Sequence, residues 1–367
     1  MAFTVDDQRH MARAIQLAWQ GLYTTSPNPR VGCVLVKDGV VVGEGFHLRA
    51  GEGHAEVNAL AAAGEQARGA TAYVTLEPCS HQGQTPPCAD ALIAAGVARV
   101  VAAVQDSDPR VSGEGFARLR AAGVEVTTGV CSEEAHRDLA GFFLKVEQGR
   151  PWLTLKLATS LDGRIATATG ESKWITGPAA RRAVHLLRAT HDAVMVGGGT
   201  ARADDPQLNV RGFPVPVQPV RVVVSRFLDL PLMGQLARTA REVPVWICHG
   251  PDVQPEMRRT WEGLGARLFP CRLSQGRVDA SAALHALGAA GLTRVFCEGG
   301  GQLAASLLSA DLVDELHLFS AGVALGAEGH PGLGALGIAR LEDAPRYVLA
   351  DLSVEGGDVH QVWRRAG

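Results

Sequence analysis

His54-Ala55-Glu56, followed downstream by Glu77-Pro78-Cys79 and then by Cys88, is the part of the sequence from which the fold and chemistry are best predicted. One imidazole and two thiolates can hold a zinc ion and leave a fourth position open for water, as catalytic zinc sites do. Glu56 lies two residues from His54, close enough to move protons without binding metal. We therefore predict a catalytic zinc, with Glu56 as the catalytic residue and the ligands His54, Cys79 and Cys88.

Two plainer interpretations of the same residues are possible. Unpaired cysteines are often small buried hydrophobic residues, and a purely structural zinc would need a fourth protein ligand and would have no use for Glu56. His-x-Glu followed by Pro-Cys and a second Cys is, however, the signature of zinc-dependent nucleobase deaminases. That signature has two residues between its cysteines, whereas residues 80–87 intervene here, which indicates a specialised deaminase.

Composition narrows the class of protein. The 367 residues favour two domains, and 46% apolar with 20% charged residues is typical of a globular protein. A net charge of −3 and only 5% aromatic residues argue against nucleic acid as a partner. The start has no signal-peptide pattern, and no apolar stretch is long enough for a membrane span. Seven cysteines, an odd number, argue against structural disulfides. We expect a cytoplasmic location.

The first part of the chain alternates between helical and strand patterns. A hairpin over residues 31–42 and later strand–helix alternation predict a mixed sheet with helices on both faces. Expected helices cover residues 5–22, 54–63, 88–96, 113–122 and 132–147; expected strands cover 31–36, 40–42, 72–76, 98–104 and 124–128. Cys88 would begin a helix, whose dipole favours a thiolate.

A polar break at Gln148-Gly149-Arg150-Pro151 predicts a boundary between domains 1–148 and 149–367. The second domain restarts with a strand over residues 152–158 and ends in a hairpin over 345–364. Between them we expect helices at 178–190, 279–290 and 301–309, and strands at 193–197, 220–224, 243–247 and 294–297.

Two glycine-rich junctions follow strands in the second domain. They read Val196-Gly197-Gly198-Gly199-Thr200 and Glu298-Gly299-Gly300-Gly301. Glycine lets the backbone approach a ligand closely, and a helix start offers free N–H groups to anions, which suits a dinucleotide. A tight turn that needs small residues is the alternative, since neither junction is Gly-x-Gly-x-x-Gly. Lys156, on one face of the opening strand, indicates either a pocket or a solvated strand face.

Longer motifs in both halves carry a family resemblance. The first half contains Pro27-Asn28-Pro29-Arg30-Val31-Gly32, His54-Ala55-Glu56-Val57 and Glu77-Pro78-Cys79-Ser80-His81. The second contains Lys156-Leu-Ala-Thr-Ser-Leu-Asp-Gly-Arg164, Gly170-Glu-Ser-Lys-Trp-Ile-Thr176 and Ala203-Asp-Asp-Pro-Gln-Leu208. In this order they resemble the bifunctional riboflavin-biosynthesis deaminase–reductase of bacteria over nearly the whole chain, least clearly at residues 212–290.

The resemblance implies an α/β protein with two domains. The first would be a cytidine-deaminase-like α/β/α domain that holds one Zn²⁺ and deaminates a diaminopyrimidinone carrying a phosphoribosylamino arm. The second would be a dihydrofolate-reductase-like domain in which NADPH reduces the ribosyl group to ribityl. Its implied cofactor contacts are Ala158, Trp174, Thr200, Asp204, Ser225 (a weaker match), Gly300, Gly301, Gln302, Leu303, Ala304, Ala305 and Ser306. The implied substrate contacts are Asn28, His47, Lys156, Ser172, Arg188, Leu208, Arg211 and Glu298.

One residue departs from the family pattern. Gln84 occupies a position where the family usually has a basic residue, which would grip the substrate phosphate. The alternatives to the two-step enzyme are a nucleic-acid-editing zinc deaminase with an appended binding domain, and a deaminase whose reductase domain is degenerate. We expect a homo-oligomer that acts on a small pyrimidine ribosyl phosphate, with neither nucleic acid nor membrane as partner.

Overall fold

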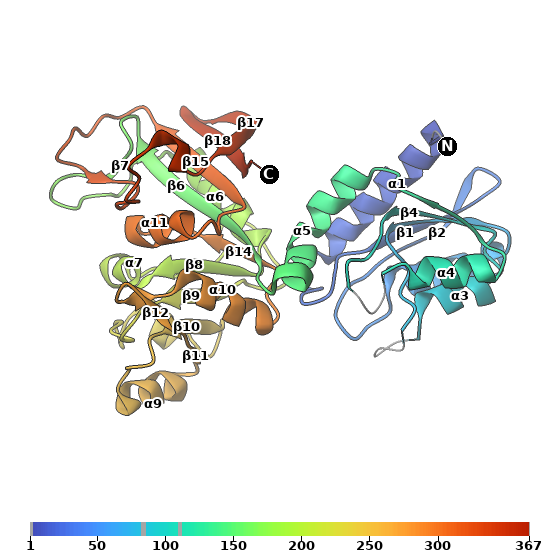
Figure 1. Cartoon of the computed structure of the whole chain (residues 1–367), viewed down its shortest axis with the longest axis horizontal. Helices are drawn as coiled ribbons and strands as arrows, with labels where there is room; N and C mark the ends of the chain where they lie inside the picture. Colours follow the sequence, from blue (N-terminus) through green and yellow to red (C-terminus); the bar gives the residue numbers. More distant parts are fainter. Residues whose placement is uncertain (1–2, 82–85, 109–111, 367) are drawn as a thin grey trace. The chain divides into compact units, whose positions relative to one another are not determined.

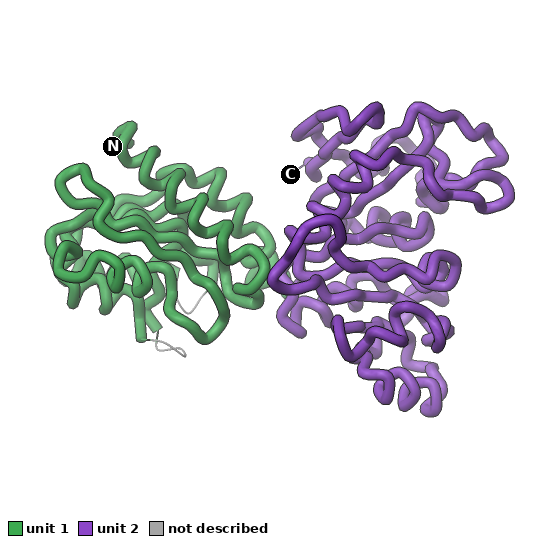
Figure 2. Tube along the Cα trace, turned by 180° about the vertical axis from the view of Figure 1, so that it is seen from behind, with its two compact units in different colours: residues 1–149 green, residues 150–367 purple. Residues whose placement is uncertain are grey.

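The computed structural model of the chain describes residues 3–81, 86–108 and 112–366. These residues form two compact units, Met1–Gly149 and Arg150–Gly367 (Figure 2). Each unit is built around one main sheet covered by helices (Figure 1). Among the described residues no helix is long and apolar enough to cross a membrane.

The first unit contains a five-stranded sheet with the order β2-β1-β3-β4-β5. Strand β1 runs antiparallel to β2 and β3, whereas β3, β4 and β5 are parallel, so the sheet is mixed as predicted. The strands are β1 (Gly32–Lys37), β2 (Val40–Phe46), β3 (Thr71–Leu76), β4 (Arg99–Val104) and β5 (Glu125–Thr128). The helices are α1 (Val5–Ala18), α2 (Ala55–Ala63), α3 (Cys88–Ala94), α4 (Glu114–Ala121) and α5 (Ser132–Gln148), with 3₁₀ turns η1 (Trp19–Gly21) and η2 (Gly64–Ala67).

Alternation along β1 explains why helices cover both faces of this sheet. Cys33 and Leu35 pack into one core with α2, α3 and α4, and Val34 and Val36 pack into another with α1. Successive strand residues point to opposite faces, so a continuous apolar run needs two cores. On β2, a Cβ at Gly45 would lie 2.3 Å from the Ala55 carbonyl oxygen, so glycine lets the start of α2 approach the sheet closely.

The second unit contains a nine-stranded sheet with the order β11-β10-β9-β8-β14-β6-β15-β18-β17. Its strands are parallel from β11 to β15, and the β17–β18 hairpin is added antiparallel. They are β6 (Trp152–Ser160), β8 (Ala193–Gly197), β9 (Val220–Val224), β10 (Val245–His249), β11 (Arg267–Pro270), β14 (Arg294–Cys297), β15 (Glu315–Ala321), β17 (Tyr347–Glu355) and β18 (Asp358–Arg365).

Helices cover both faces of this second sheet. One apolar core includes α10 and α11, and the other includes α6, α8 and α9. The helices are α6 (Pro178–Ala189), α7 (Gly198–Asp204), α8 (Gln235–Arg238), α9 (Pro255–Leu264), α10 (Ala280–Ala289) and α11 (Gly301–Ser309). The remaining elements are two small sheets, β12 (Leu273–Ser274) with β13 (Arg277–Val278) and β16 (His330–Pro331) with β7 (Arg164–Ala166), and the 3₁₀ turn η3 (Leu341–Asp343).

Strand β15 was not among the predicted elements, although it lies next to β6 within the sheet. Its inward positions include Glu315 and His317 rather than apolar residues only. The His317 ring contacts the Glu315 carboxylate at 2.9 Å, and Arg364 donates to the same carboxylate at 3.0 Å. Polar side chains that bond to one another occupy positions where a buried strand usually has apolar residues. The apolar alternation by which a strand is predicted is therefore missing from β15.

A buried ion pair fixes the start of the second unit. Arg150 donates to both carboxylate oxygens of Asp314 at 2.7 and 2.9 Å, and each side chain is only 4% exposed. Asp314 also accepts from the Leu153 N–H, at 2.8 Å. The polar break predicted at residues 148–151 therefore contains an arginine that belongs to the interior of the unit.

We predict that Asp314→Asn lowers the free energy of unfolding of this unit by about 3–5 kcal/mol, because it leaves a buried guanidinium without its counter-charge. Chemical denaturation would measure the loss. Asp311→Asn is the matched control, since Asp311 is 72% exposed and pairs with Arg365 at the surface; it should change stability by less than about 0.5 kcal/mol. Equal losses in the two variants would contradict the prediction.

Candidate active sites

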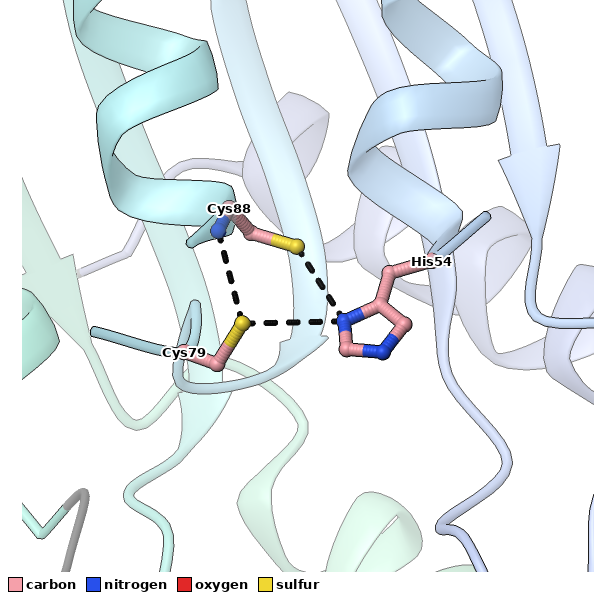
Figure 3. A group of neighbouring side chains, drawn as sticks. All are labelled: His54, Cys79 and Cys88. Atoms are coloured by element: carbon pink, nitrogen blue, oxygen red, sulfur yellow. Dashed lines mark hydrogen bonds between the residues drawn. The ribbon is translucent and has the colours of Figure 1, made fainter. Parts of the chain in front are cut away.

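Three predicted metal ligands converge in the first unit. His54 precedes α2, Cys79 follows the end of β3, and Cys88 begins α3. Figure 3 shows the three side chains pointing toward one another. The His54 Nδ1 atom lies 3.6 Å from Cys79 Sγ and 3.3 Å from Cys88 Sγ, and all three donor atoms lie within 4.8 Å of one another.

These separations fit a tetrahedral zinc site. With Zn–S bonds of about 2.3 Å and Zn–N bonds of about 2.0 Å, a tetrahedron places sulfur and nitrogen about 3.5 Å apart. The two measured N···S distances, 3.6 and 3.3 Å, are close to this value. Two soft sulfur donors and one imidazole are also the donor types that zinc prefers. The three ligands would leave the fourth position free for water, as the sequence predicted.

Cys79, rather than Cys88, receives the hydrogen bond from the helix start. The backbone N–H of Cys88 donates to Cys79 Sγ at 3.3 Å. Hydrogen bonds from Cys88 and His54 lower the pKa of the Cys79 thiol to about 4, whereas its hydrogen bond to Cys79 and burial raise the pKa of Cys88. The N–H group of the first helical residue thus points at the neighbouring ligand, Cys79. A thiolate at Cys88, at the start of α3, stays a prediction.

Glu56 lies beside this group of ligands, in the first turn of α2. It is only 3% exposed. Burial raises the pKa of Glu56 to about 7, and the negative charge of Cys79 adds to the effect. A carboxyl group with a pKa near neutrality can both accept and donate a proton under ordinary conditions.

Asn28 and His47, predicted to contact the pyrimidine, lie together next to the zinc ligands. His47 is buried, and burial lowers its pKa, so the ring is neutral near pH 7. Its Nδ1 atom lies 3.1 Å from the Gly53 carbonyl oxygen, which assigns the ring proton to Nδ1. Nε2 can then accept from the Asn28 amide at 3.2 Å. The ring of His47 packs edge-on against that of His54, with centroids 5.1 Å apart.

Glu77 is a structural part of this site that sequence reasoning did not assign. Its buried carboxylate accepts hydrogen bonds from the backbone N–H groups of Gly113 and Gly115 at 2.9 Å. It also accepts from Asp106 at 3.3 Å and Phe116 at 3.4 Å. Glu77 thus ties the start of α4 to the segment that carries Cys79. Its position two residues before the predicted ligand Cys79 is the feature of the sequence that could have identified it.

The position of Gln84, where a basic residue is usual in the family, lies outside the described residues.

A cleft of about 910 Å³ in the second unit contains most of the residues predicted for the reductase site. Predicted substrate contacts that line it are Lys156, Ser172, Arg188, Arg211 and Glu298. Predicted cofactor contacts that line it are Ala158, Trp174, Thr200, Asp204, Ser225, Gly300, Gly301, Gln302, Leu303 and Ser306. The alternative that Lys156 lies on a solvated strand face is therefore wrong.

The structure does not place Leu208, Ala304 and Ala305 at the cleft. Leu208 is 2% exposed and packs into the apolar core that includes α6. Ala304 and Ala305 are buried on α11, whereas Gln302 and Ser306 of the same helix line the cleft. A contiguous segment of a helix presents only one side to a ligand, because successive residues are rotated by about 100°.

Three of the charged side chains that line the cleft, Arg188, Glu298 and Lys156, affect one another's protonation. Arg188 binds Glu298 through two nitrogens and donates a third hydrogen bond to the Asn209 carbonyl oxygen at 2.7 Å. Burial alone would raise the pKa of Glu298, but Arg188 and Lys156 bring it below its usual value. Burial lowers the pKa of Lys156, and nearby Glu298 opposes that shift. The cleft therefore holds an anionic carboxylate next to a lysine that is easier to deprotonate than usual.

The two glycine-rich junctions meet at one edge of the cleft. Strands β8 and β14 are neighbours, and the Gly197 N–H donates to the Gly299 carbonyl oxygen at 3.2 Å. Gly299 and Gly300 have φ angles of +88° and +89°, which side chains rarely tolerate, and a Cβ at Gly300 would lie 2.8 Å from Thr200 Oγ1. These junctions need glycine for the tight turn, and they also leave backbone exposed to a ligand. The tight-turn interpretation is therefore confirmed, and binding of a dinucleotide at these junctions stays a prediction.

Further cleft residues were not predicted. His185 lies one helical turn before Arg188 on α6 and accepts from the Arg211 backbone N–H at 3.2 Å. Helical spacing from Arg188 was the signal that could have identified it. Arg181 stacks over the exposed ring of Trp174, with its guanidinium carbon 4.6 Å from the ring centroid. Both residues line the cleft.

At another part of the cleft, Ser225 donates to the Asp229 carboxylate at 2.8 Å, and Arg202 pairs with the same carboxylate at 2.8 Å. Ser225 follows β9, so three neighbouring parallel strands, β9, β8 and β14, all end at this cleft. Ligands in open α/β sheets bind outside the carboxyl ends of such strands.

Family comparisons agree with this geometry. The model for the cytidine and deoxycytidylate deaminase zinc-binding region matches residues 4–104, and the model for the RibD C-terminal domain matches residues 151–354. With the His54–Cys79–Cys88 group in place, they define a class: a zinc-type deaminase domain followed by a dihydrofolate-reductase-like reductase domain.

Full-length relatives then identify the family. The riboflavin biosynthesis protein RibD of Escherichia coli (strain K12) is 46% identical over 97% of this chain and 98% of its own length. Acinetobacter baumannii RibD, form 1, superposes with a TM-score of 0.89 at 40% identity and covers 99% of both chains. The Thermotoga maritima diaminohydroxyphosphoribosylaminopyrimidine deaminase/5-amino-6-(5-phosphoribosylamino)uracil reductase superposes with a TM-score of 0.85 at 32% identity and covers 98% of this chain and 99% of its own. The chain belongs to the RibD family of bifunctional deaminase–reductases in riboflavin biosynthesis. The resemblance inferred from the motifs is confirmed.

We predict that Glu77→Gln weakens zinc binding while leaving the fold intact, because an amide cannot accept four N–H groups and Cys79 loses its anchored position. Removing a group that holds a metal ligand in position costs about 10–100-fold in metal affinity. A chelator competition assay would measure it. Glu114→Gln is the matched control, since Glu114 lies in the same helix start but is exposed. Unchanged zinc affinity in Glu77→Gln would contradict the positioning role.

Proposed function

We propose that the first unit deaminates 2,5-diamino-6-(5-phosphoribosylamino)pyrimidin-4-one and that the second unit then reduces the ribosyl group of the product to ribityl with NADPH. The deaminase and reductase named for the Thermotoga maritima relative are the same two activities. The observation that carries the proposal is that each unit contains its own site: the His54–Cys79–Cys88 group in one and the Lys156–Glu298 cleft in the other.

In the deaminase site, His54, Cys79 and Cys88 would hold the zinc ion. When bound, zinc would act as a Lewis acid that lowers the pKa of a bound water molecule to a value near neutrality. Glu56 would take the proton from that water and deliver it to the departing amino group, for which a pKa of about 7 is well suited. The Asn28 amide and the neutral His47 ring, linked at 3.2 Å, would orient the pyrimidine.

In the reductase site, NADPH would supply the hydride, so the protein has to position the substrate rather than perform the redox chemistry itself. The glycine junctions at Gly197–Gly199 and Gly299–Gly301 leave room for the cofactor's pyrophosphate beside the start of α11. Glu298, kept anionic by Arg188, would accept hydrogen bonds from sugar hydroxyl groups. Lys156, with its lowered pKa, would donate a proton as the ribosyl ring opens.

A degenerate reductase domain is the alternative that the family leaves open for this chain. The cleft opposes it, because Lys156, Arg188 and Glu298 all line it and Arg188 pairs with Glu298. The editing alternative has no comparable support, since the relatives of this chain match it over both domains. We also propose that the protein is located in the cytoplasm and forms a homo-oligomer.

We predict that Glu56→Gln retains one zinc per chain and loses deamination by at least about a hundredfold, because the amide cannot carry a proton. Metal analysis and a deamination assay would measure the two effects. Cys88→Ala is the comparison variant and should lose zinc as well as deamination. Reduction of the deaminated intermediate should be unchanged in both variants. Retained deamination in Glu56→Gln would overturn the proton-carrying role.

The whole proposal is tested by incubating the chain with the diaminopyrimidine ribosyl phosphate, with and without NADPH, and following product mass. We expect exchange of an amino group for oxygen without NADPH, and gain of two further hydrogens when NADPH is present. Oxygen exchange alone would establish the degenerate-reductase alternative. Intact substrate in a zinc-loaded sample would show that the substrate assignment is wrong.

A further inference from the structure

Residues 208–211 form a short segment between α7 and β9 that belongs to no helix or strand and ends with Arg211 at the cleft. Its first residue, Leu208, has a φ angle of +52°, in the left-handed region that residues with a side chain rarely adopt. The Leu208 side chain is buried in an apolar core. A backbone in this conformation persists only where the surrounding structure holds it.

Two side chains from outside the segment hold the backbone of its last two residues. Gln218 accepts a hydrogen bond from the Val210 N–H at 2.8 Å and donates one to the Val210 carbonyl oxygen at 3.2 Å. His185, on α6, accepts from the Arg211 N–H through its Nδ1 atom at 3.2 Å. Residues 212–219, which follow Arg211, form no helix or strand. The bond to His185 therefore matters for where the Arg211 backbone lies.

The His185 ring has to be neutral to accept this hydrogen bond. Burial, which has the largest effect, and the nearby guanidinium groups of Arg188 and Arg211 lower the pKa of His185. Glu298 and the Asn209 carbonyl group act in the opposite direction and are outweighed. The ring is therefore neutral near pH 7, with its proton on Nε2 and a lone pair on Nδ1 that can accept.

The two cleft arginines near His185 differ in what their guanidinium groups are bonded to. Arg188 binds Glu298 through two nitrogens and donates another hydrogen bond to the Asn209 carbonyl oxygen. The Arg211 side chain is exposed, lines the cleft, and makes no hydrogen bond or ion pair with the part of the chain that the structure describes. A guanidinium whose donors are all free suits an anionic group of a ligand, and a phosphate is such a group.

We propose that His185 is a positioning residue of the reductase site, which holds the Arg211 backbone so that the Arg211 guanidinium binds the phosphate of the substrate. This inference rests on the proposed function, because the phosphate belongs to the deaminated intermediate that the second unit would reduce. His185 acts through the Arg211 backbone and not by contact with the phosphate. Without its acceptor the Arg211 backbone would lose a fixed position, and phosphate binding would have to restore that order.

Equilibrium binding to the full chain without NADPH tests the proposal, with the deaminated intermediate and its dephosphorylated form as the two ligands. His185→Leu removes the acceptor and should weaken binding of the phosphorylated ligand by about three- to tenfold, which corresponds to one neutral hydrogen bond. Binding of the dephosphorylated ligand should be unchanged. His185→Asn, in which Oδ1 replaces Nδ1 as acceptor, should bind both ligands as the wild type does.

The matched control is His285→Leu, the same change at an exposed histidine of α10 that does not line the cleft. It should alter the affinity for neither ligand. NADPH affinity, measured separately, should be the same in all of these variants, because His185 is assigned to the phosphate of the substrate and not to the cofactor.

A double variant separates positioning from a general effect on the cleft. Arg211→Ala should weaken binding of the phosphorylated ligand by about 10–100-fold, because hydrogen bonds to a charged group are lost. Adding His185→Leu to Arg211→Ala should weaken binding no further, since His185 acts through Arg211.

The outcomes distinguish this inference from the proposed function. A wild type that neither binds nor reduces the deaminated intermediate would overturn both. If the wild type reduces it, three results would each overturn the positioning role alone: wild-type affinity in His185→Leu, a loss in His185→Asn as large as in His185→Leu, or additive losses in the double variant.

Discussion

Parallel strands all end at the same edge of a sheet, and both sites of this protein depend on that constraint. In the first unit, β3 delivers Cys79 and the neighbouring β4 leads to Asp106, whose N–H bonds the Glu77 carboxylate. In the second unit, β9, β8 and β14 deliver Ser225 and the two glycine junctions to one cleft. Residues far apart in the chain become neighbours because the hydrogen-bond ladder fixes where each strand stops.

Within these sites, neighbouring groups shift the pKa values of two glutamate side chains in opposite directions. Glu56 and Glu298 are both glutamates in or beside a buried site, yet the pKa of Glu56 is raised to about 7 and that of Glu298 is lowered. The difference lies in the neighbours: a thiolate stands near Glu56, whereas a guanidinium binds Glu298 through two nitrogens. The first carboxyl group is thereby suited to proton transfer and the second to holding a polar ligand.

Sequence was sufficient where chemistry needs particular residue types at a particular spacing. The His54, Glu56, Cys79 and Cys88 pattern and the mixed sheet could be predicted in this way. Most cleft residues were predicted only through the resemblance to a known family. Sequence was insufficient where the role of a residue depends on the direction in which its side chain points. Leu208, Ala304 and Ala305 match family positions but point into the protein interior. The thiol that receives the helix N–H, the polar strand β15 and the four hydrogen bonds of Glu77 depend on contacts between segments that no local pattern records.

The position of β6 has a consequence for the order in which the protein is made. It is the first strand of its unit, yet both of its neighbours, β14 and β15, come from the far end of the unit. During synthesis β6 therefore leaves the ribosome long before either neighbouring strand has been made. Until then its apolar residues Leu153 and Leu155 cannot be buried within a sheet. The first unit has no such delay, since all its strands pair within residues 32–128. Protection of the nascent chain matters most while residues 161–293 are being added.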